Sequence, residues 1–273
     1  MQTLELAGAS VPVIGQGTWH MGEDPHQRKH EVAALRLGIE HGMTLIDTAE
    51  MYAEGGAEEV VGEAIAGQRD RVFLVSKVYP HNASRTGIVE ACERSLRRLG
   101  TEHINLYLLH WPGQHPLEET VEAFERLREA GKIGGWGVSN FDVTDMAHLA
   151  NPACATNQVL YNLEQRGIEF DLLPWAQIHL MPLMAYCPIA QAGHLLKNPV
   201  LQDIAARHDA TPAQICLAWV LRNKGVIAIP KAVKPEHIRL NAAAAQLTLT
   251  AEDLHAIDSA WPAPTRKRVL AMV

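Results

Sequence analysis

The feature that most constrains this chain is an alternation of short apolar runs with longer segments of helical periodicity. Eight runs rich in β-branched residues are typical of strands, and between them apolar residues recur three and four positions apart. Strands that alternate with helices form parallel sheets, and eight such units close into a (β/α)8 barrel, an α/β fold. The predicted strands are Val11–Ile14, Thr44–Ile46, Val72–Ser76, Leu106–Leu109, Ile133–Val138, Ala155–Leu160, Pro182–Tyr186 and Val226–Ile229.

Helix signals support this interpretation. Apolar residues at helical spacing predict helices over Lys29–His41 and Thr86–Leu99. The segment Thr211–Gln214 is a capping box with proline at the first helical position. Gly100 and Gly131 stand where helices are predicted to end.

The chain shows no internal boundary. No shift of composition, linker or charge run divides it, and 273 residues suit one barrel of about 250 residues. We therefore expect one domain over residues 1–273. The segment Thr3–Leu6 is expected to pair with Val11–Val13 as a hairpin that closes the barrel floor.

Composition excludes several classes of function. Apolar residues make up 47% of the chain, which suffices for a large core. The net charge of −7 argues against nucleic-acid or anionic-membrane partners. No signal peptide or membrane span is readable, and the four scattered cysteines suit free thiols in a reducing compartment. We expect a cytoplasmic protein, whose oligomeric state stays open and is compatible with a monomer.

Polar side chains follow three consecutive predicted strands. Asp47 ends one strand, with Tyr52 five positions later, Lys77 ends the next, and His110 the one after. The carboxyl ends of barrel strands share one rim, so we expect these four side chains to lie together.

The four residue types suit proton donation. A tyrosine is a poor acid at neutral pH unless a cation stabilises its phenolate, and Lys77 can supply that cation while Asp47 holds it charged. A neutral His110 can hydrogen-bond a carbonyl oxygen. Each residue alone has an ordinary structural interpretation, such as a helix cap, a solvated lysine or a core histidine. Together they predict a site that protonates a developing alkoxide.

Separated sequence blocks resemble the aldo-keto reductase family in order and spacing. They are Asp47–Tyr52, Gly56–Gly62, Ser76–Val78, Leu109–Pro112, Gly137–Phe141, Asn157–Gln158 and Ile229–Lys231. Several phrases, including GQGTWHMGED, are similar to bacterial members associated with methylglyoxal. The resemblance implies NADPH-dependent reduction of small aldehydes and α-dicarbonyls. It assigns Tyr52 as general acid, Lys77 and Asp47 as its tuning partners, and His110 as the group that orients the carbonyl.

The resemblance also implies how the cofactor is held. Ser139, Asn140 and Gln158 would bind the nicotinamide carboxamide, and Tyr186 would stack on the nicotinamide. Further cofactor contacts are implied for Thr18, Trp19, Cys187, Gln191, Lys231, Lys234, His237 and Asn241. No GxGxxG motif occurs, so a Rossmann fold is unsupported.

The phosphate-binding block departs from the family pattern. Lys231 and Lys234 stand beside a helix start opened by Pro235, which suits an anion. NADPH-selective members usually carry serine and arginine where this chain has Ala232 and His237. NADPH is the expected cofactor, and use of NADH stays open.

Aromatic residues are expected to line the substrate pocket, namely Trp19, His20, Tyr79 and Trp111. The chain stops soon after the predicted helix Ala251–Ala260, so the pocket is expected to be open. No metal-ligand spacing occurs, and no metal is predicted.

Two other functions stay open at this point. One is a nucleotide-sensing regulatory subunit with little turnover, because channel subunits with this fold keep the same four groups. The other is a lyase that uses Lys77 to form a Schiff base, which needs a neutral amine.

Overall fold

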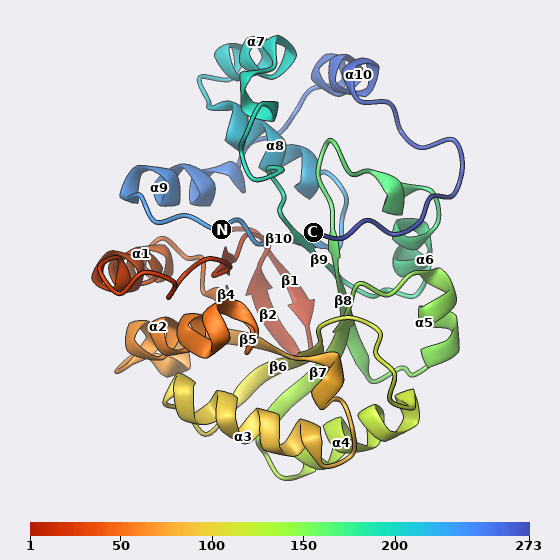
Figure 1. The fold of residues 1–273 in the computed structure, drawn as a ribbon. Helices are drawn as coiled ribbons and strands as arrows, with labels where there is room; N and C mark the ends of the chain where they lie inside the picture. The colour runs from red at the N-terminus through yellow and green to blue at the C-terminus, as the bar shows by residue number, and fades with distance from the viewer.

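The computed structural model describes residues 1–273 and has a sheet of eight parallel strands at its centre, surrounded by helices (Figure 1). The strands run in chain order around the sheet, each beside its predecessor. They are β3 (Gln16–Gly17), β4 (Leu45–Asp47), β5 (Phe73–Val78), β6 (Ile104–Leu109), β7 (Ile133–Ser139), β8 (Cys154–Leu160), β9 (Leu183–Tyr186) and β10 (Val226–Ala228).

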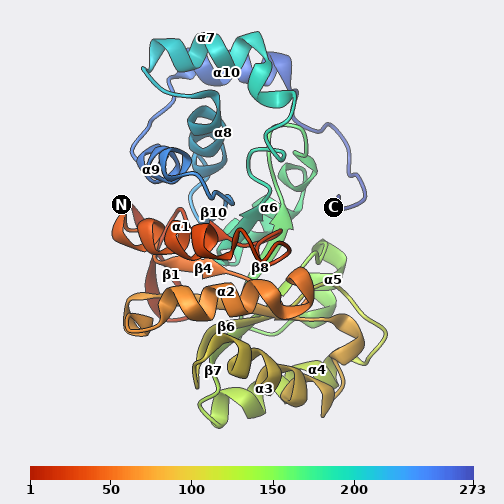
Figure 2. The ribbon, with the colours of Figure 1, turned by 60° about the vertical axis from the view of Figure 1, so that its left-hand side comes forward.

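Ten α-helices connect or cover these strands (Figures 1 and 2). They are α1 (Arg28–Glu40), α2 (Gly56–Ile65), α3 (Gly87–Leu99), α4 (Leu117–Glu129), α5 (Val143–Leu149), α6 (Leu172–Ile178), α7 (Pro199–Arg207), α8 (Pro212–Leu221), α9 (Pro235–Ala244) and α10 (Ala251–Ala260). The predicted helices, the capping box at Thr211 and the left-handed glycines after α3 and α4 are confirmed. No helix has the length and apolar character needed to cross a membrane.

The first and last barrel strands meet through backbone hydrogen bonds, which close the (β/α)8 barrel. Gly15 N donates to Ala228 O at 2.9 Å and Gly17 N to Pro230 O at 3.1 Å. A Cβ on Gly17 would lie 2.7 Å from the carbonyl oxygen of Ile229, so only glycine permits this approach.

The predicted hairpin is confirmed, with β1 (Thr3–Leu6) antiparallel to β2 (Ala9–Pro12). The prediction that Val11–Ile14 forms the first barrel strand is wrong in part. Residues 11 and 12 belong to the hairpin, and the barrel strand is β3. Gln16 fills this buried strand because its amide donates to Leu35 O at 3.2 Å and Met43 O at 2.9 Å. Because Gln16 is polar, an apolar sequence pattern does not predict β3.

Two apolar clusters stabilise the barrel. The smaller one fills the interior, where Leu45, Val75, Leu106 and Ile227 are fully buried. The larger one lies between the sheet and the helices. The interior is therefore a packed core, which leaves the carboxyl ends of the strands as the place for a site.

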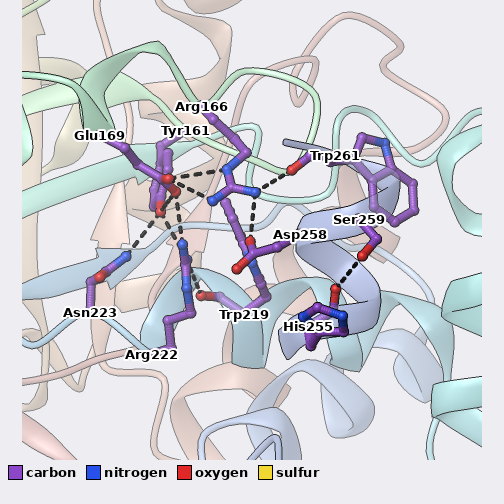
Figure 3. A network of polar contacts seen from close by, with 10 residues as sticks. All are labelled: Tyr161, Arg166, Glu169, Trp219, Arg222, Asn223, His255, Asp258, Ser259 and Trp261. Atoms are coloured by element: carbon purple, nitrogen blue, oxygen red, sulfur yellow. Dashed lines mark hydrogen bonds and ion pairs between the residues drawn. The ribbon is translucent and has the colours of Figure 1, made fainter. Parts of the chain in front are cut away.

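A polar network joins the loop after β8 to α8 and α10 (Figure 3). Glu169 accepts from Arg166 at 2.7 Å and from Arg222 at 2.8 Å. Arg166 also pairs with Asp258 at 2.8 Å and donates to the carbonyl oxygen of Trp261. The network fixes the end of α10, and residues 262–273 return from there to the barrel, where the C-terminus lies beside β9 in the view of Figure 1.

Candidate active site

The four side chains expected at the barrel rim lie together. Asp47 ends β4, Lys77 lies in β5, His110 follows β6, and Tyr52 begins the short 3₁₀ turn η1 (Tyr52–Gly55). Lys77 Nζ donates to Asp47 Oδ2 at 2.7 Å and to the carbonyl oxygen of Thr48 at 2.9 Å. The same Nζ lies 3.1 Å from the Tyr52 hydroxyl. One buried ammonium thus joins a carboxylate to a phenol.

Burial and charge set the protonation of this cluster. Burial raises the pKa of Asp47 and lowers that of Lys77, while their mutual contact opposes both shifts. Burial, reinforced by the Asp47 charge, raises the pKa of Tyr52 well above its usual value. The phenol therefore keeps its proton at neutral pH, and Lys77 is the cation in contact with it when the proton leaves.

His110 faces this cluster in its neutral form. Its ring centroid lies 5.7 Å from that of Tyr52. Burial, with the Lys77 charge, lowers the pKa of His110 to about 2. Its Nδ1 atom is buried and has no hydrogen-bond partner. Its carbonyl oxygen accepts from Asn140 at 3.1 Å, which ties the β6 rim to β7.

A cavity of about 240 Å³ opens over Tyr52 and His110. Its walls are mostly apolar, and besides Tyr52 and His110 its polar groups come from the carboxyl-terminal parts of β7, β8 and β9 and from the residue after β7. The predicted site residues that line it are Trp19, Tyr52, His110, Trp111, Ser139, Asn140, Gln158 and Tyr186.

A second cavity, of about 290 Å³, shares Trp19, Tyr52 and Tyr186 with the first. The other predicted residues in its wall are Thr18, His20, Asp47, Cys187, Gln191 and Lys231. The two cavities therefore adjoin at Trp19, Tyr52 and Tyr186, and one extends to Trp111 and the other to Lys231.

Five predicted residues line neither cavity, and one of them is Lys77, which reaches the site through its contact with the Tyr52 hydroxyl. Tyr79 packs edge-on against Trp111 at a centroid distance of 5.9 Å and lies outside the walls of both cavities. Lys234, His237 and Asn241 lie at the start of α9 or within it, beyond Lys231.

Several lining residues escaped sequence reasoning. Met51, Met272 and Val273 line the first cavity, and Pro188 and Ile189 line the second. We expected the short carboxyl-terminal segment to leave the pocket open, and Met272 and Val273 of this segment contribute part of its wall. Among these lining residues only Met51 was predictable, because it is next to Tyr52 in the chain.

No group of three or more His, Cys, Asp or Glu side chains is arranged to hold a metal ion. The four cysteines form no disulfide, and Cys187 alone is partly exposed.

Comparison with known proteins identifies the family. The model of the aldo/keto reductase family matches residues 13–262. The methylglyoxal reductase YeaE of Escherichia coli is 57% identical over 272 residues, covering 97% of this chain and 96% of its own. A glyoxal reductase of Bacillus subtilis is 34% identical, covering 92% and 90%. A Klebsiella pneumoniae aldo/keto reductase, solved with NADP and acetate, is 56% identical with a TM-score of 0.98 over 99% of both chains. This chain belongs to the aldo/keto reductase family.

Proposed function

We propose that this chain reduces small aldehydes and α-dicarbonyl compounds, methylglyoxal among them, to alcohols with NADPH. The observation that carries the proposal is the position of the Tyr52 hydroxyl, 3.1 Å from the Lys77 ammonium and at the meeting point of two cavities. The names of the E. coli and B. subtilis relatives support the choice of substrate class. The barrel acts as one domain over residues 1–273.

Each residue of the cluster has a role in carbonyl reduction. Bound NADPH supplies a hydride to the carbonyl carbon. Tyr52 gives its proton to the carbonyl oxygen, and the ammonium of Lys77 stabilises the phenolate that remains. Asp47 keeps Lys77 charged through the 2.7 Å contact. His110, whose pKa of about 2 keeps it neutral at physiological pH, orients the carbonyl oxygen by a hydrogen bond.

The residues present fit a nicotinamide cofactor. Ser139, Asn140 and Gln158 gather hydroxyl and amide groups in the wall of the first cavity, which suits a carboxamide. Tyr186 lines both cavities and offers its ring as a stacking surface. The Klebsiella relatives solved with NADP and with NADPH support the same assignment.

The second cavity suits the phosphate part of the cofactor. Lys231 stands in its wall, and Lys234 precedes the first residue of α9, where backbone N–H groups favour an anion. Lys231, Lys234 and His237 are exposed and free to contact a phosphate.

A Schiff-base reaction at Lys77 is disfavoured by the same geometry. Its Nζ contacts Asp47, Thr48 and Tyr52 at once, and the carboxylate of Asp47 at 2.7 Å favours the ammonium over the free amine that a Schiff base needs.

The test is the loss of NADPH absorbance in the presence of methylglyoxal, run beside NADH. Turnover that depends on methylglyoxal and yields an alcohol supports the proposal. Tight NADPH binding without turnover of methylglyoxal or other aldehydes would favour the sensing role instead.

A further inference from the structure

A second ion pair, with a fully buried carboxylate and a partly exposed guanidinium, lies on the opposite side of β5 from Lys77. Ser76 and Lys77 are consecutive in the strand, so their side chains point to opposite faces. Lys77 points into the barrel, and Ser76 Oγ donates to Glu58 Oε1 at 2.6 Å. The other carboxylate oxygen of Glu58 accepts from Arg98 Nε at 2.6 Å. Glu58 is fully buried between α2 and α3.

Arg98 also supports the turn that begins with Tyr52. Three successive residues of this turn, Ala53, Glu54 and Gly55, have φ angles of 51°, 52° and 94°. Left-handed backbone is unfavourable for residues with a side chain, so such a turn persists only where its surroundings hold it. A Cβ on Gly55 would lie 2.4 Å from Arg98 Nε, which means that the Arg98 side chain lies directly against the Gly55 backbone.

The two oxygens of Glu58 therefore connect the two parts of the proton-donating pair. One contact leads through Ser76 to the strand position next to Lys77. The other leads through Arg98 to the turn of Tyr52. We propose that the Glu58–Arg98 pair is a positioning unit that keeps the Tyr52 hydroxyl and the Lys77 ammonium within hydrogen-bond distance. This inference rests on the proposed function, since it concerns the same proton donor.

A merely structural ion pair is the competing explanation. Buried ion pairs add little net stability compared with apolar packing of the same volume, and burial raises the pKa of Glu58 against the opposing effect of Arg98 and Ser76. Burial of the Glu58 charge therefore costs free energy, and it occurs where Glu58 and Arg98 contact the strand of Lys77 and the turn of Tyr52. This cost is explained if the geometry of Tyr52 and Lys77 depends on the pair.

Two conservative variants test the proposal. Arg98→Lys keeps the charge and removes Nε from beneath Gly55, and Ser76→Ala removes the contact with Glu58 while leaving the ion pair. Arg97→Lys is the matched control, because Arg97 is the exposed neighbour of Arg98 on α3. With methylglyoxal, both test variants should lower kcat about 10-fold, equivalent to about 1.4 kcal/mol in the barrier. The Kd for NADPH should change less than about twofold, which corresponds to a change in binding free energy of less than about 1 kcal/mol.

The pH profile separates positioning from stability. A Tyr52 phenolate held farther from Lys77 is less stabilised, so the alkaline limb of kcat should move to higher pH in both test variants. Unchanged kcat and an unchanged limb in Arg98→Lys and Ser76→Ala, with only a lowered Tm, would overturn the proposal.

A readout without turnover keeps this test separate from the proposed function. Tyrosine labelled with ¹³C at Cζ reports the hydrogen bonding of each phenol, and Tyr52→Phe assigns the Tyr52 resonance. The resonance should shift in Arg98→Lys and Ser76→Ala and stay in place in Arg97→Lys. An unchanged resonance in the test variants contradicts the positioning role, whatever the activity. An inactive wild-type protein whose resonance shifts as expected would contradict only the proposed function.

Discussion

Gln158 Nε2 donates a hydrogen bond of 2.7 Å to Asp47 Oδ1, across 111 positions of the sequence. The other oxygen of Asp47 accepts from Lys77, also at 2.7 Å. The carboxylate is therefore held from β8 on one side and from β5 on the other. Gln158 also lines the cavity that we propose for the nicotinamide, so its amide connects that cavity to the Asp47–Lys77 pair.

Gln158→Met should lower kcat at saturating NADPH by about 10-fold. Hydrogen bonds to charged groups contribute about 1.5–3 kcal/mol, and part of this contribution holds Asp47 against Lys77. Stopped-flow measurement of the hydride step is the check. Gln165→Met is the control, because the Gln165 side chain is exposed. A hydride step as fast as in wild type would show that Asp47 does not need this contact.

His110 should make the protein less stable as pH falls. Its pKa is about 2 in the folded chain, against an ordinary value near 6.5 in the unfolded chain. The unfolded chain therefore binds a proton below pH 6.5 that the folded chain does not. The contribution of neutral His110 to the free energy of unfolding is therefore fully present above this pH and is lost as pH falls toward 2.

The measurement compares wild type with His110→Gln, whose side chain does not titrate. Between pH 8 and pH 5, the free energy of unfolding should fall by about 2 kcal/mol more in wild type. Urea unfolding at both pH values gives the difference. Equal losses in the two proteins would mean that His110 is protonated in the folded state.

Ala232→Ser combined with His237→Arg should raise the ratio of kcat/KM for NADPH to kcat/KM for NADH by about 10-fold over wild type. An arginine gives a permanent charge and a bidentate contact with phosphate, and the exposed imidazole of His237 offers no such fork of donors. The gain should shrink at high salt. His255→Arg, at an exposed position of α10, is the control. An unchanged ratio would place the 2′-phosphate away from α9.

The sequence predicted seven of the barrel strands near their observed positions, because buried parallel strands are continuous apolar runs. It missed β3, whose Gln16 and Gly17 carry no apolar signal. Their places depend on partners far along the chain, Met43 for the amide and Ile229 for the close approach. Such contacts exist only after the barrel has closed.

The site was predictable where it depends on strand ends. Asp47, Lys77 and His110 follow apolar runs, and the rim of a barrel brings them together. The pocket wall was not predictable, since Met51 and Met272 come from loops whose paths cannot be inferred from sequence spacing. The direction of the Tyr52 pKa also required the structure, because burial outweighs the effect expected from Lys77.

Tyr52→Phe tests the central claim most directly. The change removes one hydroxyl from the meeting point of the two cavities and leaves the ring in place. Methylglyoxal-dependent oxidation of NADPH should fall by about 1000-fold or more, the upper part of the range for a general acid. NADPH should still bind with nearly the wild-type Kd, measured by calorimetry. Turnover at the wild-type rate in this variant would contradict the account, because the proton would then come from another group.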